Sequence, residues 1–260
     1  MDLHLEDKVV IVTGASGGIG LATAELLSAE GAVVVGVARQ PVESGLGKEG
    51  SAIAADLTDA ASAPRVVETV MERYGRIDGL VNNAGGLHLR DGFLSITEEQ
   101  WLDIFQLNFH AARRMSKAAL PALLEGDGGS MVHVGSESAR LASIFNPDYA
   151  AAKLALLSLS KSLATEFTPR GVRSNVVVPG MTRTGLFERP GAFGDQIAAA
   201  LGTDVDGAID QILTSHRPSL TRRIAESEEI ARVIAYLISP LSGQVAGAEW
   251  IIDGGALPQI

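Results

Sequence analysis

The feature that most constrains this chain is a repeated alternation between short runs of β-branched residues and longer stretches of helical pattern. The short runs are apolar almost without alternation, which is typical of strands buried on both faces of a sheet. Units of strand, helix and strand place successive strands parallel, with the helices packed against the sheet. The sequence therefore predicts an α/β fold, a doubly wound parallel sheet with helices on both faces.

The expected elements can be bounded by residue number. Strands are expected at residues 9–13, 33–38, 51–55, 79–83, 130–135, 173–178 and 249–252. Helices are expected at residues 19–29, 60–74, 98–124, 148–167 and 227–238, the last with the acidic start "ESEE". Only a loop is expected between residues 39 and 52, because that stretch is short and rich in glycine.

Residues 185–223 do not continue the alternation of strands and helices, because glycine and proline interrupt them in "ERPGAFGD" and "SHRPSLTRR". One helix, at residues 206–213, is expected between these two stretches. We expect residues 1–260 to form a single domain in which 185–223 is an insertion over one end of the sheet. Loops at strand ends carry binding sites, so the insertion is expected to act as a lid over the substrate.

Composition and charge restrict the class of protein. The 260 residues include no cysteine, which excludes disulfides and thiolate chemistry. A formal net charge of -10 argues against nucleic acid or an anionic membrane as the main partner. The acidic start "MDLHLEDK" has no apolar signal region, and no apolar run is long enough to span a membrane, so a cytoplasmic protein is expected. The histidines lack the spacing of metal ligands, so no metal is expected.

A glycine-rich turn joins the first expected strand to the first helix in "VVIVTGASGGIGLATAELL". Gly14, Gly18 and Gly20 remove side chains where a backbone must turn tightly and approach a pyrophosphate. The helix behind the turn offers its N-terminal N–H groups and the positive end of its dipole to the phosphates. A glycine turn also occurs without a ligand, but its position between strand and helix favours dinucleotide binding.

The residues that follow the next strands bear on which dinucleotide binds. NAD-binding proteins usually place Asp or Glu after the second strand, whereas this chain has Ala38 and Arg39. The Arg39 guanidinium can hold a 2′-phosphate, so NADP(H) is favoured and NAD(H) stays open. Asp56 is expected to accept the adenine amino group. "NNAGG" at residues 82–86 supplies a second glycine turn, in which Asn82 is expected to link neighbouring strands.

The stretch "YAAAK" places Tyr149 four residues before Lys153, so both side chains lie on one face of the expected helix. Taken alone, such a pair is more often ordinary helix surface than a chemical site. A neighbouring ammonium would lower the tyrosine pKa from its usual value of about 10, which would let the phenol act as an acid or base near neutral pH.

Together these segments resemble the short-chain dehydrogenase/reductase family, in its roughly 250-residue branch. The resemblance implies a Rossmann-type sheet of about seven strands, an NAD(P)(H)-dependent oxidoreductase, and assembly as a homotetramer or homodimer. The matching motifs stand in the family's order over nearly the whole chain: "TGASGGIG" at 13–20, Asp56, "NNAG" at 82–85, Asn108, Ser136, "YAAAK" at 149–153, "PGMTRT" at 179–184 and "IDGG" at 252–255.

By this resemblance, four positions carry the catalytic roles. Tyr149 matches the tyrosine that gives or takes the proton at the substrate oxygen. Lys153 matches the lysine that lowers the pKa of that tyrosine and contacts the nicotinamide ribose. Ser136 matches the serine that hydrogen-bonds the substrate carbonyl or alcohol, with Ser138 as a rival in "GSES". Asn108 matches the asparagine that holds a water in the proton relay behind the lysine.

The expected cofactor and substrate contacts follow from the same motifs. Thr184 is preferred over Thr182 as the residue that binds the nicotinamide carboxamide or a phosphate. Gly17 departs from the pattern, because a basic residue at that position would support NADP. A substrate pocket is expected at Glu137, Ser138, Met181 and Phe187. Cofactor contacts are expected from Gly14, Ser16, Gly17, Gly18, Ile19, Gly20, Arg39, Asp56, Leu57, Asn83, Ala84, Gly85, Tyr149, Lys153, Pro179, Gly180, Thr182 and Thr184.

The resemblance implies an enzyme that interconverts a ketone and a secondary alcohol, with NADPH-dependent reduction as the favoured direction. Candidate substrates are a 3-oxoacyl thioester, a polyketide or other cyclic ketone, and a sugar or steroid alcohol. A non-catalytic NADP(H)-binding sensor or scaffold is the alternative, although a sensor has no need of a proton relay. A lyase or epimerase of the same fold is a third option, although those relatives are generally longer.

Overall fold

A seven-stranded parallel sheet forms the centre of the computed structural model, which describes residues 2–141, 143–216 and 218–258. The strand order is β3-β2-β1-β4-β5-β6-β9. The order changes direction between β1 and β4, the place where ligands bind in open α/β sheets. The strands are β1 (Val9–Thr13), β2 (Val33–Ala38), β3 (Ser51–Ala54), β4 (Gly79–Asn82), β5 (Gly129–Val134), β6 (Val172–Pro179) and β9 (Glu249–Ile252).

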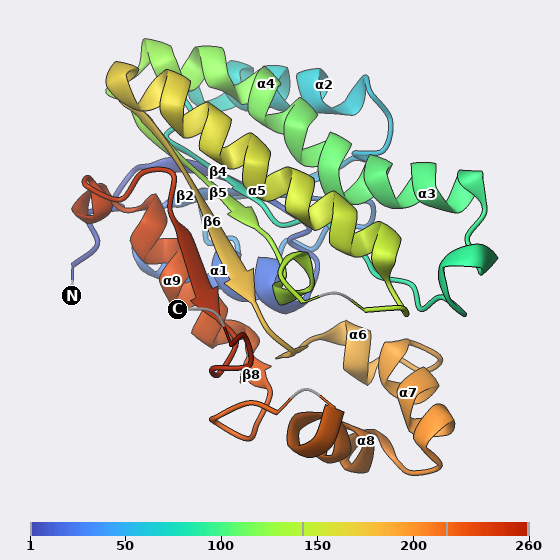
Figure 1. Ribbon diagram of the computed structural model, residues 1–260. Coiled ribbons are helices and arrows are strands. Elements are labelled where there is room, and N and C mark those ends of the chain that lie inside the picture. The colour runs from blue at the N-terminus through green and yellow to red at the C-terminus, as the bar shows by residue number, and fades with distance from the viewer. Residues whose placement is uncertain (1, 142, 217, 259–260) are drawn as a thin grey trace.

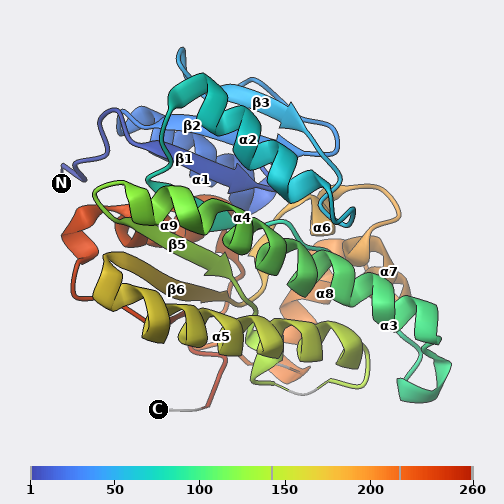
Figure 2. The same cartoon turned by 90° about the horizontal axis from the view of Figure 1, so that it is seen from above.

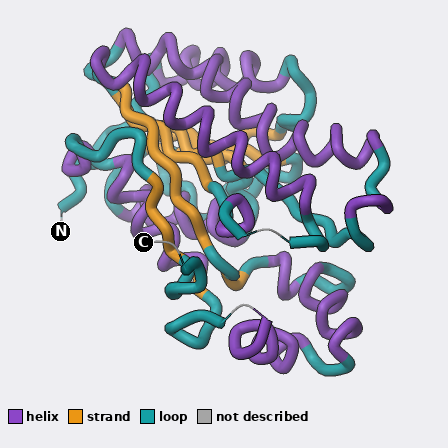
Figure 3. Tube along the Cα trace, viewed as in Figure 1, coloured by secondary structure: helices purple, strands orange, loops and turns teal. Residues whose placement is uncertain are grey.

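Helices cover both faces of the sheet (Figure 1), and Figure 3 shows the strands enclosed between these two layers. One layer holds α2 (Ser62–Tyr74), α4 (Ala111–Glu125) and α5 (Pro147–Phe167), and the other holds α1 (Gly18–Ala29) and α9 (Ser227–Ile238). Seen from above (Figure 2), four further helices lie beyond the sheet: α3 (Glu98–Phe105), α6 (Gly185–Glu188), α7 (Phe193–Leu201) and α8 (Val205–Gln211). None of the helices in the described ranges is long and apolar enough to cross a membrane.

The central strands are stable because their side chains enter two cores, one on each face of the sheet. Side chains alternate between the two faces of a strand. Val9 and Ile11 of β1 pack with residues of α2 and α4, whereas Val10 and Val12 pack with residues of α1 and α9. The side chains of Val10, Ile11 and Val12 are fully buried. Burial of an aliphatic side chain contributes about 1.5–3 kcal/mol, so a run of valines holds the middle of the sheet in place.

The seven expected strands are confirmed, and their ends move by at most one residue. The loop expected after Arg39 is also confirmed, because residues 39–50 form no helix or strand. The single helix expected at residues 98–124 is wrong in detail. A π-helical segment, Gln106–His110, separates α3 from α4 and inserts an extra residue into the helical turn around Asn108.

The segment at residues 185–223 holds α6, α7 and α8, so the expectation of one helix is wrong. The polar residues around "ERPGAFGD" end and begin short helices there. The Thr184 hydroxyl accepts the Leu186 N–H at the start of α6, and the Asp195 carboxylate accepts the Gly191 N–H before α7. Arg217 belongs to the segment expected to act as a lid, and it lies outside the described residues.

This segment has a small apolar core of its own. Phe187, Ile197, Ile209 and Leu213 are buried together, and the rings of Phe187 and Phe193 meet edge to face at 5.3 Å. Residues from outside this segment pack in the same core: Leu89 from the loop after β4, Met181 after β6, and Ile224. We call the group at residues 185–213 the lid cluster, after the lid expected from the sequence.

Thr13, the last residue of β1, joins β1 to β4 at the edge of the sheet where ligands are expected. Its hydroxyl donates to the Val81 carbonyl at 3.2 Å and accepts the N–H groups of Asn83 and Ala84 at 2.9 and 3.0 Å. The residue is 1% exposed, so water cannot replace these partners. Thr13 therefore fixes the turn after β4 beneath the turn after β1.

We expect Thr13→Val to lower the free energy of unfolding by about 1–2 kcal/mol, because it keeps the shape of the side chain but removes the hydroxyl that accepts the Ala84 N–H and one of the two acceptors of the Asn83 N–H. Urea denaturation measures the change. Thr165→Val is the matched control, since its exposed hydroxyl bonds only the Lys161 carbonyl of its own helix. Equal losses in the two variants would show that Thr13 does not anchor the turn.

Candidate active site

The turn between β1 and α1 has the geometry of a phosphate-binding loop. Gly14 and Gly18 have φ values of 68° and 53°, in the left-handed region that favours glycine. A Cβ on Gly20 would collide with the carbonyl oxygen of Gly14 and with the Asn83 side chain. Gly17 is the N-cap of α1 and provides no side-chain cap, which leaves first-turn N–H groups for a ligand. This cradle fits the pyrophosphate of a dinucleotide.

Asn83 locks the two turns together. Its side-chain amide donates to the carbonyl oxygens of Thr13 and Gly14 at 3.0 and 3.2 Å. The preceding Asn82 lies inside the core, where its amide contacts Ser116 of α4 and His133 of β5 at 3.0 and 3.2 Å. The expectation that Asn82 links neighbouring strands is confirmed.

Arg39 and Asp56 stand at the carboxyl ends of the neighbouring strands β2 and β3. Asp56 accepts the Thr58 hydroxyl and N–H at 2.7 and 2.9 Å, and these bonds hold the pKa of its carboxyl below the ordinary value. The Arg39 guanidinium contributes to the same shift, while burial opposes it. Arg39 is exposed, so its charge is available to a ligand. The Leu57 side chain is buried in the core and offers a ligand only its backbone.

The structure brings Tyr149, Lys153 and Ser136 together beside the glycine turns that follow β1 and β4. Tyr149 and Lys153 lie one turn apart on α5, with the Lys153 ammonium 5.6 Å from the centre of the Tyr149 ring. Lys153 is 3% exposed, and its Nζ donates to the Val134 carbonyl at 2.8 Å. Ser136, just beyond β5, hydrogen-bonds the Tyr149 phenol.

The sequence predicts that the Lys153 ammonium lowers the pKa of Tyr149, and for the protein alone this prediction is wrong. Burial raises the pKa of Tyr149 to about 12; the hydrogen bond from Ser136 opposes the rise, and the Glu137 carboxylate adds to it. Burial also lowers the pKa of Lys153 to about 8. Burial therefore shifts each group toward its neutral form, but at neutral pH only the phenol is uncharged, because a lysine with a pKa of about 8 still carries its proton.

Asn108 occupies the π-helical segment and connects it to the second glycine turn. Its Nδ2 donates to the carbonyl oxygens of Gly86 and Ile104 at 2.9 and 3.0 Å, and its Oδ1 accepts the Gly86 N–H at 3.1 Å. A Cβ on Gly85 would lie 2.9 Å from Asn108 Oδ1 and 3.4 Å from Lys153 Nζ. Gly85 thus leaves the space in which Asn108 and Lys153 approach each other.

The residues after β6 reach back to the first glycine turn. The Thr184 methyl lies against Gly18, where a Cβ on the glycine would come within 2.9 Å of it. Thr182 is buried, and its hydroxyl donates to the Gly180 carbonyl at 3.0 Å. Thr182 also belongs to a short second sheet, β7 (Thr182–Arg183) with β8 (Ala225–Glu226). Pro179 ends β6 next to Gly180.

A cavity of about 150 Å³ is lined by Glu137, the residue after Ser136, and by Leu213 of the lid cluster. Two of the four expected pocket residues, Glu137 and Met181, line it, and Phe187 packs in the lid cluster instead. Ser138 is buried, and its N–H donates to Ser136 Oγ at 3.2 Å. Further lining comes from residues near the chain's end and the lid, among them Leu213, Ser219, Thr221, Arg223, Asp253 and Gly254.

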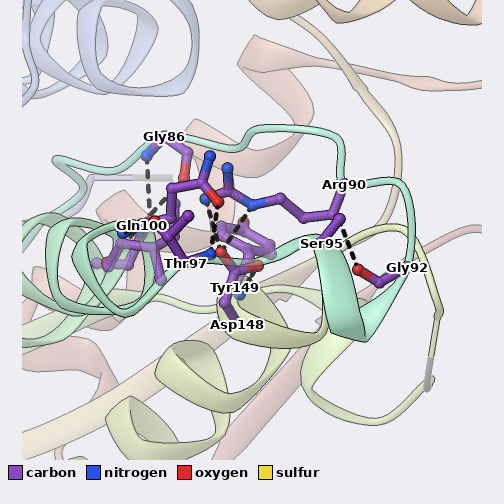
Figure 4. A network of polar contacts seen from close by, with 10 residues as sticks. Gly86, Arg90, Gly92, Ser95, Thr97, Gln100, Asp148 and Tyr149 are labelled. Atoms are coloured by element: carbon purple, nitrogen blue, oxygen red, sulfur yellow. Dashed lines mark hydrogen bonds and ion pairs between the residues drawn. The ribbon is translucent and has the colours of Figure 1, made fainter.

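Three charged residues at this site were not predicted from the sequence: Arg90, Asp148 and Arg189. Arg90 forms an ion pair with Asp148, the residue before Tyr149, and Figure 4 shows this pair against the first turn of α5. The Arg189 guanidinium lies near Gly17, with its Nη2 3.5 Å from the place of a Cβ on that glycine. Asp148 was detectable as an acidic residue in the first turn of a helix. Nothing in the sequence pairs it with an arginine 58 positions away.

Within the described part of the chain, no group of three or more His, Cys, Asp or Glu side chains is placed to hold a metal ion. His133, the most deeply buried histidine of this region, contacts Asn82 and Ser174. Burial lowers its pKa to about 4, with a smaller contribution from the Lys153 charge, so the ring stays neutral.

Comparisons with known proteins agree with this site. Residues 8–192 match the model of the short chain dehydrogenase family. The chain is 34% identical to the 3-oxoacyl-[acyl-carrier-protein] reductase FabG of Escherichia coli (strain K12) over 259 residues, which cover 97% of this chain and 98% of the relative. The chain therefore belongs to the short-chain dehydrogenase/reductase family, whose members are NAD(P)-dependent oxidoreductases.

Two solved structures extend the comparison. The L-sorbose reductase from Gluconobacter frateurii, complexed with NADPH and L-sorbose, superposes with a TM-score of 0.91 at 31% identity and covers 100% of both chains. The Thermoplasma acidophilum aldohexose dehydrogenase (AldT) superposes with a TM-score of 0.87 at 28% identity, covering 100% of this chain and 99% of that one. The protein is thus an enzyme that acts on a CH–OH group or the corresponding ketone.

We expect Lys153→Met to stabilise the protein near neutral pH. The lysine pKa is about 8 in the folded protein and 10.5 in the unfolded chain, so folding is penalised fully below pH 8 and not above pH 10.5. Removing the charge should raise the free energy of unfolding by about 1–3 kcal/mol at neutral pH, after loss of the Val134 hydrogen bond.

This gain should shrink as the pH rises toward 10.5. Urea denaturation across this pH range measures it, and Lys161→Met, which removes an exposed ammonium from the same helix, is the control. A stability difference that does not change with pH would contradict the buried-ammonium interpretation.

Proposed function

We propose that the protein is an NADPH-dependent reductase that converts a ketone into a secondary alcohol. The observation that carries this proposal is the convergence of Ser136, Tyr149 and Lys153 beside the glycine turn. When bound there, NADPH supplies a hydride from nicotinamide C4. The protein's own task is then to hold the carbonyl and to deliver a proton to its oxygen.

In this proposal Ser136 and Tyr149 hold the carbonyl oxygen with two hydroxyl donors, which stabilises the negative charge that develops on it. Tyr149 then donates its proton to that oxygen as the general acid. A phenol with a pKa of about 12 in the free protein is almost fully protonated at neutral pH, which suits a proton donor. The Lys153 ammonium, close to the ring, stabilises the phenolate left behind.

Asn108 serves, in this proposal, as the link through which Tyr149 and Lys153 regain a proton. Its side chain lies across the narrow space at Gly85 from the Lys153 ammonium. Both polar ends of the Asn108 amide are engaged by Gly86, and a π-helical turn sets its position. An amide fixed in this way can orient a water molecule behind the lysine.

Arg39 supports NADP(H) over NAD(H). Its guanidinium stands at the end of β2, where the 2′-substituent of the adenosine ribose binds in this fold, and no carboxylate occupies that position. The relative solved with NADPH agrees with this choice. Arg189, beside Gly17, is a second cation near the place proposed for the cofactor phosphates.

The cavity lined by Glu137 favours a hydroxylated ketone such as a ketose. Carboxylates of Glu137 and Asp253 and hydroxyls of Ser219 and Thr221 line it, and such oxygens accept and donate hydrogen bonds to sugar hydroxyls. A 3-oxoacyl thioester is the second candidate, because the curated relative reduces that class. We further propose a cytoplasmic homotetramer or homodimer with residues 185–223 as a lid, on the family resemblance.

We expect Tyr149→Phe to lower kcat at least about 100-fold, since it removes the proton donor, while the affinity for NADPH changes little. Turnover is measured by NADPH absorbance with L-sorbose and with an acetoacetyl thioester, and binding by NADPH fluorescence. Tyr74→Phe, at a hydroxyl that bonds only the Glu49 carbonyl and Ser51, is the control. Binding of NADPH with no turnover of any ketone by the unchanged protein would favour a sensor instead.

We expect Arg39→Met to weaken NADPH binding about 10–100-fold and to leave NADH binding nearly unchanged, because only NADPH carries the 2′-phosphate. Arg232→Met, at an exposed arginine of α9, is the control for a general loss of positive charge. Equal losses for both cofactors would contradict the assignment of Arg39 to the 2′-phosphate.

A further inference from the structure

A buried ion pair ties the loop after β4 to the first turn of α5 (Figure 4). Nε and Nη2 of Arg90 both donate to Oδ2 of Asp148, at 2.9 and 2.7 Å. The Asp148 side chain is fully buried, and the Arg90 side chain is 9% exposed. The desolvation of a buried pair commonly cancels its attraction, so such a pair is weak evidence for a role in stability alone.

The other oxygen of the same carboxylate holds the backbone of the proposed proton donor. Asp148 Oδ1 accepts the Tyr149 N–H at 2.9 Å. Asp148 follows Pro147 in the first turn of α5, where N–H groups have no partner within the helix. One carboxylate therefore binds both the Arg90 guanidinium and the residue whose phenol faces Ser136.

The loop that carries Arg90 also touches the lid cluster. Leu89 packs against the apolar core of residues 185–213, while the Arg90 N–H donates to the Phe145 carbonyl at 2.9 Å. Gly86, in the same loop, is bonded to Asn108. The lid cluster thus has a short route to the turn that carries Tyr149, through the packing of Leu89 and the ion pair of Arg90 with Asp148.

Charged groups reach Tyr149 from three elements. Lys153 and Asp148 share its helix, Glu137 comes from the turn after β5, and Arg90 comes from the loop after β4. With Arg90 in place, the carboxylate next to Tyr149 is neutralised. Without it, a second buried negative charge would join that of Glu137 beside the phenol and oppose its ionisation.

We propose that Arg90 and Asp148 are a positioning pair for Tyr149, which holds the phenol toward Ser136 and keeps a neutral wall beside it. The proposal rests on the role of Tyr149 as proton donor. It adds two residues that act through Tyr149 rather than on the substrate. The pair also connects the loop after β4 to the proposed proton donor.

The test compares Arg90→Met, Asp148→Asn and the double variant R90M/D148N in ketone reduction with NADPH, using L-sorbose or the acetoacetyl thioester, whichever reacts faster. Because Tyr149 must be protonated, kcat falls as the pH rises through its pKa in the complex. R90M leaves the negative charge of Asp148 unpaired, so the pH at which kcat falls should rise by about one unit. D148N leaves a positive charge and should move it about one unit down.

In R90M/D148N the fall in kcat should return to the wild-type pH, because the two charges disappear together. Its kcat should stay about tenfold low, because the tether to Tyr149 is lost, while the Kd for NADPH stays within about twofold. The double variant also guards against misfolding of the single variants, since removing both members of a buried pair is often tolerated. Wild-type kcat in a folded double variant would overturn the proposal.

Arg76→Met is the matched control. Its guanidinium pairs with Asp78, whose side chain is 9% exposed, at the amino end of β4, the opposite end of the sheet. It should cost stability without moving the pH dependence. If the unchanged protein reduces neither ketone, the proposed function fails, and the pair is judged by tyrosinate absorbance against Tyr149→Phe. In that titration, shifts of the Tyr149 pKa in opposite directions in R90M and D148N would support the positioning pair. The same Tyr149 pKa in both variants would overturn it.

Discussion

The structure of the active site depends on one buried cation, the Lys153 ammonium. A lysine inside a protein is costly unless its N–H groups find partners, and here the Val134 carbonyl provides one at 2.8 Å. That bond fixes α5 against the end of β5. Because Tyr149 lies one turn earlier on α5 and Ser136 lies two residues beyond Val134, the same contact sets the distance between phenol and serine.

Burial and the surrounding charges set the ionisation of Lys153 and of the Tyr149 phenol. Burial favours the neutral form of both groups, and the Glu137 carboxylate further opposes ionisation of the phenol. The Arg90–Asp148 pair adds no net charge to this setting. Transient ionisation of Tyr149 therefore depends on the Lys153 charge and on the ligand that binds at the glycine turn. With a pKa of about 12, the Tyr149 phenol stays protonated at neutral pH in the protein alone.

Much of this arrangement could be predicted from sequence, and the limits have physical causes. Runs of valine predict the strands, and Gly14, Gly18 and Tyr149 stand in motifs whose spacing is local. The π-helical turn at Asn108 has no such signal, since it arises where α3 and α4 meet the second glycine turn. The short helices of residues 185–213 were missed because proline and glycine separate them without preventing them.

The partners of the buried groups were also beyond reach from sequence. The pKa of Tyr149 depends on how deeply α5 packs, which a four-residue spacing does not contain, so its direction was predicted wrongly. Likewise, Arg90 and Asp148 meet because the loop after β4 folds over the start of α5. Such long-range contacts follow from the fold as a whole. The local motifs predict the class of chemistry, and the packing sets its details.

The central claim, hydride transfer from NADPH to a ketone held by Ser136 and Tyr149, is tested most directly with NADPH deuterated at nicotinamide C4. The alcohol formed from L-sorbose or an acetoacetyl thioester is analysed by mass spectrometry and NMR. The account predicts deuterium on the new carbinol carbon, with a hydroxyl proton that comes from solvent, and no labelled product in Tyr149→Phe. NADPH that binds but transfers no label, or equal transfer in Tyr149→Phe, would contradict it.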